Sequence, residues 1–255
     1  MYPHQADGIG DDSRDLSSDE EETATLTDVP SVTVTNPDGY HTPSTIFISR
    51  EEQCEAMWFS SGDLIIRAGL VAFRVFREVL ARCSPVLAKL LSTAQLELCD
   101  SFDGARVIEF SQTPVDVEHF LKAIFDPLSL NPKYQDNITF DTIAGVYEVS
   151  SHYRVLDFQC TALCMLSELY PTDLTVFLTE QFVPAYCCDQ SIPLIVFARK
   201  HRLDWLLPLA FYRHCLEFSS TSLLYGVQYN GVVSKLSLAD QKLCIDAHTT
   251  MYHTT

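Results

Sequence analysis

Apolar and polar positions alternate in two neighbouring runs of the chain, a pattern that predicts a β-hairpin. The runs, residues 64–67 and residues 70–75, are rich in β-forming side chains and flank a turn dipeptide. In the second run the large apolar side chains share one face, whereas Ala72 and Arg74 share the other. We therefore expect this strand to be buried on one side only.

After the hairpin the apolar spacing changes to three and four residues, which predicts helices. Ser84-Pro85 is a capping serine followed by a first-turn proline, so it divides the first helical stretch in two. Thr113-Pro114 marks another helix start in the same way. The expected elements are helices over residues 79–91, 114–126, 140–153 and 156–169 and a strand over residues 106–110.

The sequence past Tyr170-Pro171 keeps a helical pattern to its last residue. Capping residues mark four helix starts, at Thr172, Asp189, Asp204 and Ser237. We therefore expect an all-α C-terminal extension over residues 171–255, which follows a mixed region over residues 55–170.

Negative charge is concentrated before the first of these elements. Residues 1–56 hold 13 acidic side chains against Arg14 and Arg50, so they carry −11 of the total charge of −17 and leave −6 for the rest. Few large apolar side chains precede Ile46, so this segment cannot bury enough surface to offset its chain entropy. We expect residues 1–54 to be an acidic disordered segment.

The composition limits the class of protein. With 17 basic against 34 acidic side chains, the chain lacks the positive charge that a general affinity for nucleic acids or anionic membranes requires. Hydrophobic residues make up 47% of the 255 residues, enough for a real core, and the order of elements indicates an α+β fold. No apolar run reaches the roughly 18 residues that span a bilayer, and no secretory signal is visible. We expect an intracellular protein of the nucleus or cytoplasm, without a membrane or direct nucleic acid partner.

The residues around the hairpin resemble the BTB/POZ domain. The motifs that carry the resemblance are Gly62-Asp63-Leu64-Ile65-Ile66, Phe73-Arg74-Val75-Phe76-Arg77 and Ser84-Pro85-Val86-Leu87. In that family an Asp precedes the first strand, an apolar-x-apolar strand follows, and Ser-Pro opens the next helix. Phe76 departs from the pattern, because the family usually has His there. The resemblance covers about residues 58–169, and both Phe125-Asp126-Pro127 and residues 192–216 resemble BTB proteins of mushroom-forming fungi.

The resemblance implies a small β-sheet with a hairpin, flanked by α-helices, over residues 55–170. It implies a non-catalytic protein–protein interaction module, a scaffold that dimerises with itself or with another BTB protein. It further implies that Asp63 and Arg77 lie in a charged groove at the centre of the dimer, where Phe76 would reshape the site. The alternative is that Asp63 only begins a strand and Arg77 is a solvated helix residue.

The resemblance also suggests partners other than a second BTB chain. A cullin-type ubiquitin ligase binds family members through an apolar-x-Glu motif after the second helix, and Leu96 and Glu97 are the candidates here. Gln95, two residues before the Glu, is polar, so the motif is imperfect. The other partner is a transcriptional corepressor. The swapped N-terminal strand of many members has candidates in residues 31–35 and 45–48, whose side chains alternate suitably.

Reactive side chains form no recognisable catalytic motif. The sequence contains no phosphate-binding loop, nucleophile elbow or His-Glu-x-x-His, so we expect neither an enzyme nor a bound cofactor or metal. Cys160 and Cys164 are one helical turn apart, but no further pair supplies the other two ligands of a metal site. His214 and Cys215 are adjacent and diverge on a helix. The basic cluster at residues 198–202 is either a nuclear or interaction signal or a set of cations at a helix end.

Overall fold

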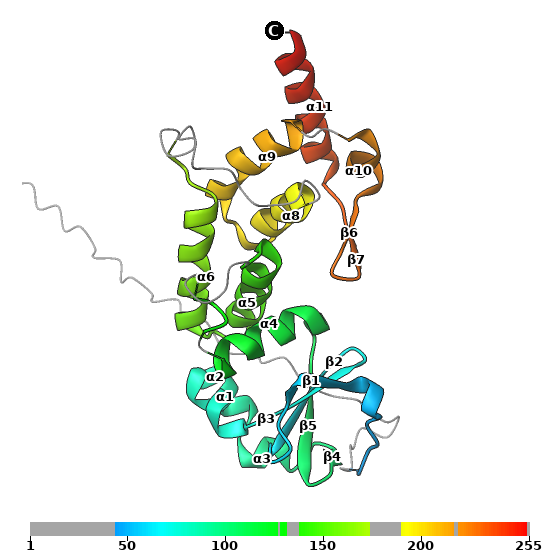
Figure 1. Ribbon diagram of the computed structural model, residues 1–255, viewed down its shortest axis with the longest axis vertical. Coiled ribbons are helices and arrows are strands. Elements are labelled where there is room, and N and C mark those ends of the chain that lie inside the picture. The colour runs from blue at the N-terminus through cyan, green and yellow to red at the C-terminus, as the bar shows by residue number, and fades with distance from the viewer. Residues whose placement is uncertain (1–43, 127, 132–137, 174–189, 217–218, 254–255) are drawn as a thin grey trace, which may run out of the picture. The chain divides into compact units, whose positions relative to one another are not determined.

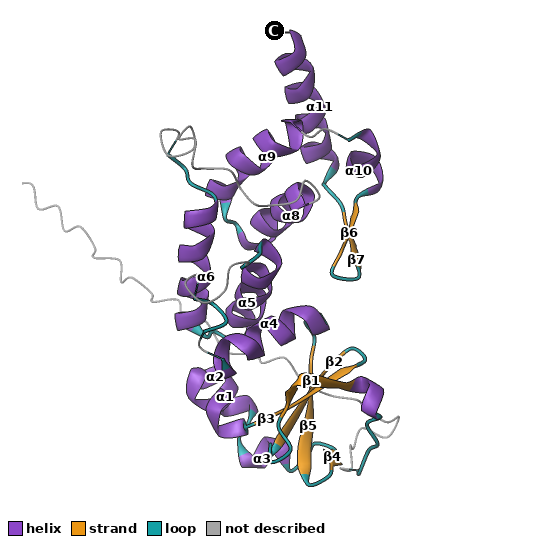
Figure 2. Cartoon of the chain, viewed as in Figure 1, coloured by secondary structure: helices purple, strands orange, loops and turns teal. Residues whose placement is uncertain are grey.

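The structure, a computed structural model, describes residues 44–126, 128–131, 138–173, 190–216 and 219–253. Figure 1 shows its elements along the chain, and Figure 2 separates helices from strands. The elements before residue 127 are β1 (Gln53–Trp58), β2 (Leu64–Ala68), β3 (Val71–Val75), α1 (Arg77–Cys83), α2 (Pro85–Leu90), α3 (Thr93–Leu96), β4 (Ser101–Phe102), β5 (Ala105–Phe110) and α4 (Pro114–Phe125). Those after residue 137 are α5 (Phe140–His152), α6 (Leu156–Leu169), α8 (Ser191–His201), α9 (Leu207–Leu216), α10 (Ser220–Tyr225), β6 (Val227–Tyr229), β7 (Val232–Ser234) and α11 (Leu238–His253).

Strands β1 to β5 form one mixed sheet in the order β1-β3-β2-β5-β4. The predicted hairpin is confirmed, because β2 and β3 pair antiparallel and Gly69 turns between them with a φ of 56°. The predicted third strand is β5, which pairs parallel to β2. On the other side of the hairpin, β1 pairs parallel to β3. Together with the helices, this sheet confirms the α+β class.

Strand β3 is buried on both faces, so the expectation of one buried side is wrong. Ala72 is 1% exposed and Arg74 is 8% exposed. The reason is that residues 44–58, which we call the covering segment, first run over the outer face of the sheet and then enter it as the edge strand β1. Ile48 of this segment packs there with Ile65 and Ala72. The covering segment is not adjacent to β3 in sequence, so the alternation within β3 does not reveal it.

The covering segment is ordered, so the prediction that the disordered region extends to residue 54 is wrong. The Ser101 N–H donates to the Ser44 carbonyl at 2.8 Å, and the Ile46 N–H donates to the Ser101 carbonyl at 2.9 Å. These bonds tie the start of the segment to β4, while its end, β1, pairs with β3. Residues 45–48 therefore form a single bridge to β4 and not the regular strand that their alternation suggests.

Other predictions fall on parts of the chain that the structure does not describe. The acidic segment up to residue 43, with its candidate strand at residues 31–35, is one such part. The helix start at Asp189 lies in another, residues 174–189, and the start near Thr172 lies just before it.

The helices after the hairpin begin at the predicted caps. Ser84 separates α1 from α2: its hydroxyl accepts a backbone N–H of α2 at 3.0 Å and donates to the Tyr153 carbonyl at 2.7 Å. Thr113 caps α4 with its side chain. Helix α4 then packs closely on α5, and Gly145 permits this because a Cβ there would lie 3.0 Å from the Asp116 Cα.

The C-terminal region contains a β-hairpin, so the prediction of an all-helical extension is wrong at residues 227–234. Strands β6 and β7 pair antiparallel around Asn230 and Gly231, whose φ values are 47° and 79°. Asn-Gly is the preferred pair of a two-residue hairpin turn because both residues adopt positive φ easily. The turn signal is therefore present in the sequence, between two helical patterns that obscure it.

Two further helix starts in the C-terminal region are confirmed. Asp204 begins a short 3-10 helix, Asp204–Leu206, that leads directly into α9. Ser237 precedes α11, and its hydroxyl accepts the Asp240 N–H at 3.1 Å. Local capping chemistry therefore places the start of α11, whereas the 3-10 helix begins without a side-chain cap.

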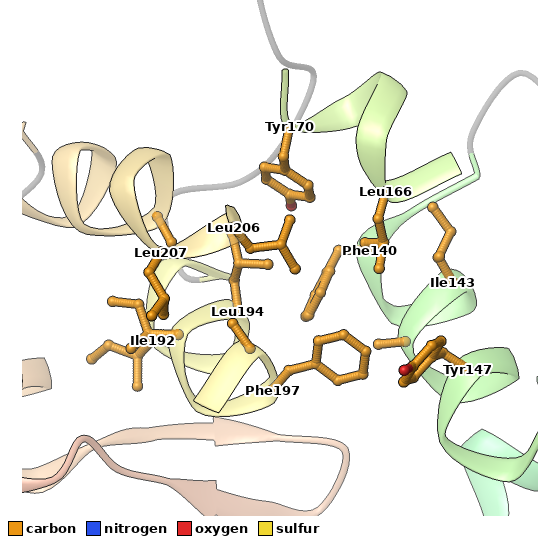
Figure 3. Close-up of a cluster of buried hydrophobic side chains, with 14 of the residues drawn as sticks. Phe140, Ile143, Tyr147, Leu166, Tyr170, Ile192, Leu194, Phe197, Leu206 and Leu207 are labelled. Carbon is orange, nitrogen blue, oxygen red and sulfur yellow. The ribbon is translucent and has the colours of Figure 1, made fainter. Parts of the chain in front are cut away.

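Besides the cluster on the outer face of the sheet, two larger hydrophobic clusters hold the described elements together, and α5 contributes to both. One cluster packs α1 to α4 against the inner face of the sheet, and Val149 near the end of α5 belongs to it. The other joins α5 and α6 to α8, α9 and β6, with Phe140 at the start of α5 (Figure 3). Helix α5 therefore couples the packing of the sheet region to that of the C-terminal region.

Candidate interaction sites

Asp63 and Arg77 lie together at the start of α1. The Asp63 carboxylate accepts the backbone N–H of Arg77 at 2.8 Å, and its other oxygen lies 3.7 Å from the Arg77 Nε. Phe76, the residue at the helix cap position, has no side-chain acceptor, so Asp63 supplies the missing cap and a negative charge at the helix N-terminus. The Asp63 and Arg77 side chains are 54% and 37% exposed, so water reaches the pair in the single chain. A charged groove at a dimer centre stays a prediction.

Phe76 packs among other aromatic rings. Its ring centroid lies 5.4 Å from that of Phe59, which in turn lies 5.3 Å from that of Phe125. This row connects the exit of β3 to the end of α4. Phe76 therefore provides an apolar contact at the position where the BTB pattern has a polar histidine.

Leu96 and Glu97 differ in their exposure. Leu96 is 4% exposed and belongs to the cluster under the sheet, so it stabilises the fold and is not available as a docking residue. Glu97 is exposed, and the apolar side chain beside it on the surface is Leu98. The docking motif expected around these residues therefore lacks its apolar contact at Leu96.

An aromatic group on the outer face of the sheet is the clearest apolar feature that the sequence analysis missed. Phe102 lies between two other rings, 6.5 Å from Phe47 and 6.4 Å from Trp58 between centroids. Phe47 is 83% exposed, so the described residues hardly cover it. We call these three residues the outer aromatic group. The alternation of residues 45–48 is the sequence signal for this surface, but alternation alone predicts a strand there.

Glu148 of α5 connects this helix to the end of α8. Its carboxylate lies 2.6 Å from the His201 Nε2 and also accepts a hydrogen bond from the Lys200 ammonium group. Arg199, the preceding residue, pairs with Asp240 of α11 at 2.8 Å. Three members of the predicted basic cluster are therefore engaged inside the fold, which favours the structural interpretation of this cluster over a free localisation signal.

The pKa of Glu148 reflects these partners. Burial raises the pKa of the carboxyl, but the hydrogen bonds from His201 and Lys200 outweigh burial and lower the pKa from 4.5 to about 2. Because the carboxyl is more acidic in the folded than in the unfolded chain, it contributes full stability above pH 4.5. That contribution is lost as the pH falls toward 2.

We expect Glu148→Gln to lower the free energy of unfolding by on the order of 2 kcal/mol at neutral pH. At about pH 3 the loss should be less than half as large, since part of the stabilisation has already gone from the wild type. Urea unfolding of both proteins at the two pH values measures this. Glu118→Gln is the control, because its pair with Lys122 is a surface contact within α4. Equal losses at both pH values would contradict the assignment.

The cysteines and histidines do not assemble a reactive centre in the described residues. No group of three or more His, Cys, Asp or Glu side chains is placed there to hold a metal ion. Cys160 and Cys164 are both exposed on α6. Burial raises the pKa of the Cys215 thiol, which opposes formation of a nucleophilic thiolate. The His214 Nδ1 lies 3.0 Å from the Ser191 hydroxyl.

Comparison of the chain with protein-family models and with curated proteins found no match in either case. Among the described helices, none combines the length and apolar character needed to cross a membrane. A function must therefore be inferred from the motifs and the geometry of the chain itself.

Proposed function

We propose that the chain is a non-catalytic protein-interaction module of the BTB type, which associates with a second copy of itself or with another BTB chain. The observation that carries this proposal is the outer aromatic group, with Phe47 exposed on a face that an oligomer would cover. The order of strands and helices around Asp63, Arg77 and Ser84-Pro85 agrees with the resemblance from which the BTB assignment comes.

The covering segment offers a simple route to such a dimer. It bonds to β4 at one end and to β3 at the other, and both strands belong to the same sheet. A covering segment from a second copy would find the same hydrogen-bond partners and the same apolar face. Exchange of this segment therefore keeps the contacts that hold it to the sheet, and the two-fold symmetry would place two copies of each residue in the interface.

Phe47 has the largest potential contribution to this interface. Full burial of a phenylalanine side chain stabilises an interface by about 1.5–3 kcal/mol. Two copies of the residue would be buried in a symmetric dimer, which doubles the effect of a substitution. Exposed aromatic residues on an ordered surface are typical of protein contact sites.

We expect the full-length chain to sediment as a dimer, and Phe47→Ala to raise its dissociation constant by at least about tenfold. Sedimentation velocity over a concentration series measures this. Leu238→Ala is a matched control, because Leu238 on α11 is 83% exposed, like Phe47, but lies outside the sheet region. A wild-type chain that stays monomeric at tens of micromolar, on the order of interaction-domain affinities, would refute the dimer.

The other partners that the resemblance suggests have less support. For a cullin-type ubiquitin ligase, Gln95 is polar and Leu96 is buried, so only Glu97 and Leu98 are presented for docking. For a transcriptional corepressor, the accessible pair of Asp63 and Arg77 is the candidate contact. Either partner would place the chain in the nucleus or the cytoplasm.

A further inference from the structure

A groove of about 560 Å³ lies along strand β7, away from the outer aromatic group. All three residues of β7 line it, together with one face of α8, one face of α5 and the residues that begin α4. Figure 1 shows the β6–β7 hairpin beside α8, with which both strands are in contact. The groove volume is within the range of about 300–1,000 Å³ that ligand pockets occupy.

The outer side of the groove is apolar and exposed. Val232 and Val233 on β7 are 58% and 56% exposed. Phe197 of α8 lines the opposite side. Two neighbouring exposed β-branched side chains at the edge of a hydrophobic groove are available for a partner to cover.

The inner side of the groove contains an unpaired carboxylate. Asp116 accepts the Thr113 hydroxyl at 2.7 Å, and among the described residues it has no Lys, Arg or His nitrogen within ion-pair distance. Burial raises the pKa of this carboxyl by more than the Thr113 hydrogen bond and the charges of His119 and Lys200 lower it. The Lys200 ammonium group also lines the groove, but it is bonded to Glu148.

Gln112, next to the Thr113 cap, adds a second unsatisfied group. Its side-chain carbonyl oxygen is buried and has no hydrogen-bond partner in the part of the chain that the structure describes. Buried acceptors are nearly always bonded in native proteins. Asp116 thus presents a charged acceptor to the groove, which a cationic donor would satisfy, whereas the Gln112 oxygen is enclosed by the chain itself.

Strand β7, whose residues line this groove, has one edge that pairs with no described strand. The described part of the C-terminal region contains a two-stranded sheet, so β7 pairs with β6 and with no other strand there. In a two-residue hairpin the residues that flank the turn are hydrogen-bonded to each other. This register places Tyr229 opposite Val232, so the N–H and C=O of the next residue, Val233, point away from β6. Such an edge is a template for an added strand.

We propose that this groove binds an extended peptide of a partner protein, which pairs with the free edge of β7 and places a lysine or arginine side chain against Asp116. Val232 and Val233 project from opposite faces of β7, so each would contact apolar side chains of the peptide on its own face. The acidic residues of the chain's own N-terminal segment are unsuitable occupants, because like charges repel at Asp116. None of the outer aromatic residues lines the groove, so the inference does not depend on the proposed dimer.

The test is selection of displayed random peptides, of about twelve residues, on the immobilised full-length chain. We expect enriched peptides to carry a basic residue flanked by alternating β-branched or aromatic residues. Their affinity is then measured by fluorescence anisotropy against the wild type, Asp116→Asn and Val233→Pro. Asp116→Asn removes the charge, whereas Val233→Pro removes the outward N–H of an edge strand that tolerates proline.

Each substitution in the groove should weaken binding by at least about tenfold, while Leu238→Ala should leave it within about twofold. Bound peptide should also slow amide hydrogen exchange at residues 232–234 of the wild type, a measurement that needs no variant. Failure to enrich any peptide, or equal affinity for all variants, would overturn the proposal. Binding that depends on Asp116 but neither on Val233 nor on exchange at β7 would overturn strand addition and indicate a small cationic ligand.

Discussion

Replacing Phe140 with alanine is expected to destabilise the protein by about 3–5 kcal/mol, because the ring is fully buried and few neighbours can fill the space. Phe140 begins α5 and lies at the centre of the cluster in Figure 3. Its ring centroid lies 6.4 Å from that of Tyr170 on one side and 5.6 Å from that of Phe197 of α8 on the other. It also lies 6.2 Å from the Tyr229 ring of β6. The substitution therefore removes contacts to three elements at once.

The two tryptophans of the chain allow this loss to be located. Trp58 packs on the outer face of the sheet, whereas Trp205 packs against the cluster that contains Phe140. In a Trp58→Phe background, Trp205 fluorescence therefore reports on the C-terminal region, while circular dichroism reports on all helices. Urea unfolding followed by both signals gives the free energy of unfolding, with exposed Leu238→Ala expected within about 0.5 kcal/mol of wild type.

Two outcomes of this measurement differ in meaning. If Phe140→Ala shifts both signals together, the sheet region and the C-terminal region unfold as one unit through α5. If only the Trp205 signal shifts, α5 does not couple them. A loss below about 1 kcal/mol in both signals would contradict the central position of the ring.

The parts of the fold that the sequence predicts well depend on local physics. The β2–β3 hairpin follows from side-chain alternation, and the helix ends at Ser84 and Ser237 follow from capping hydroxyls that bond within three residues. Each of these signals acts between neighbours in sequence. A pattern read along the chain therefore detects them without knowledge of the tertiary contacts.

The parts that the sequence mispredicts depend on segments that are distant along the chain. Alternation in β3 indicates one apolar face, but Ile48 of the covering segment packs on the other face with Ala72. Arg74 is buried as well. Leu96 was a docking candidate by its motif, yet it is part of the core because α3 packs against β5. The groove along β7 is not predicted at all, since Asp116 and Val233 are brought to it by elements that are distant in sequence.

Arg74 provides the second large expected effect, because its side chain is buried and donates to two backbone carbonyls. Its Nε donates to the Gly62 carbonyl at 2.9 Å, and its Nη2 donates to the Asp103 carbonyl at 3.2 Å. Its Nη1 pairs with the Asp103 carboxylate at 2.8 Å. We expect Arg74→Leu to destabilise the protein by about 2–4 kcal/mol, because a carbonyl left without a donor in a buried site costs about 1–3 kcal/mol.

Asp103→Asn separates the charge of this pair from its hydrogen bonds. The Asp103 side chain is 71% exposed, so removal of its charge should cost no more than about 1 kcal/mol. Asparagine also tolerates the positive φ of 47° at this position, which keeps the backbone unstrained. Urea unfolding of both variants measures the difference. Equal losses would mean that Arg74 stabilises the protein through its ion pair and not through its bonds to two backbone carbonyls. A larger loss for Arg74→Leu would mean that the carbonyl bonds matter most. It would then explain why a cation is buried in a strand whose pattern predicts a solvated face.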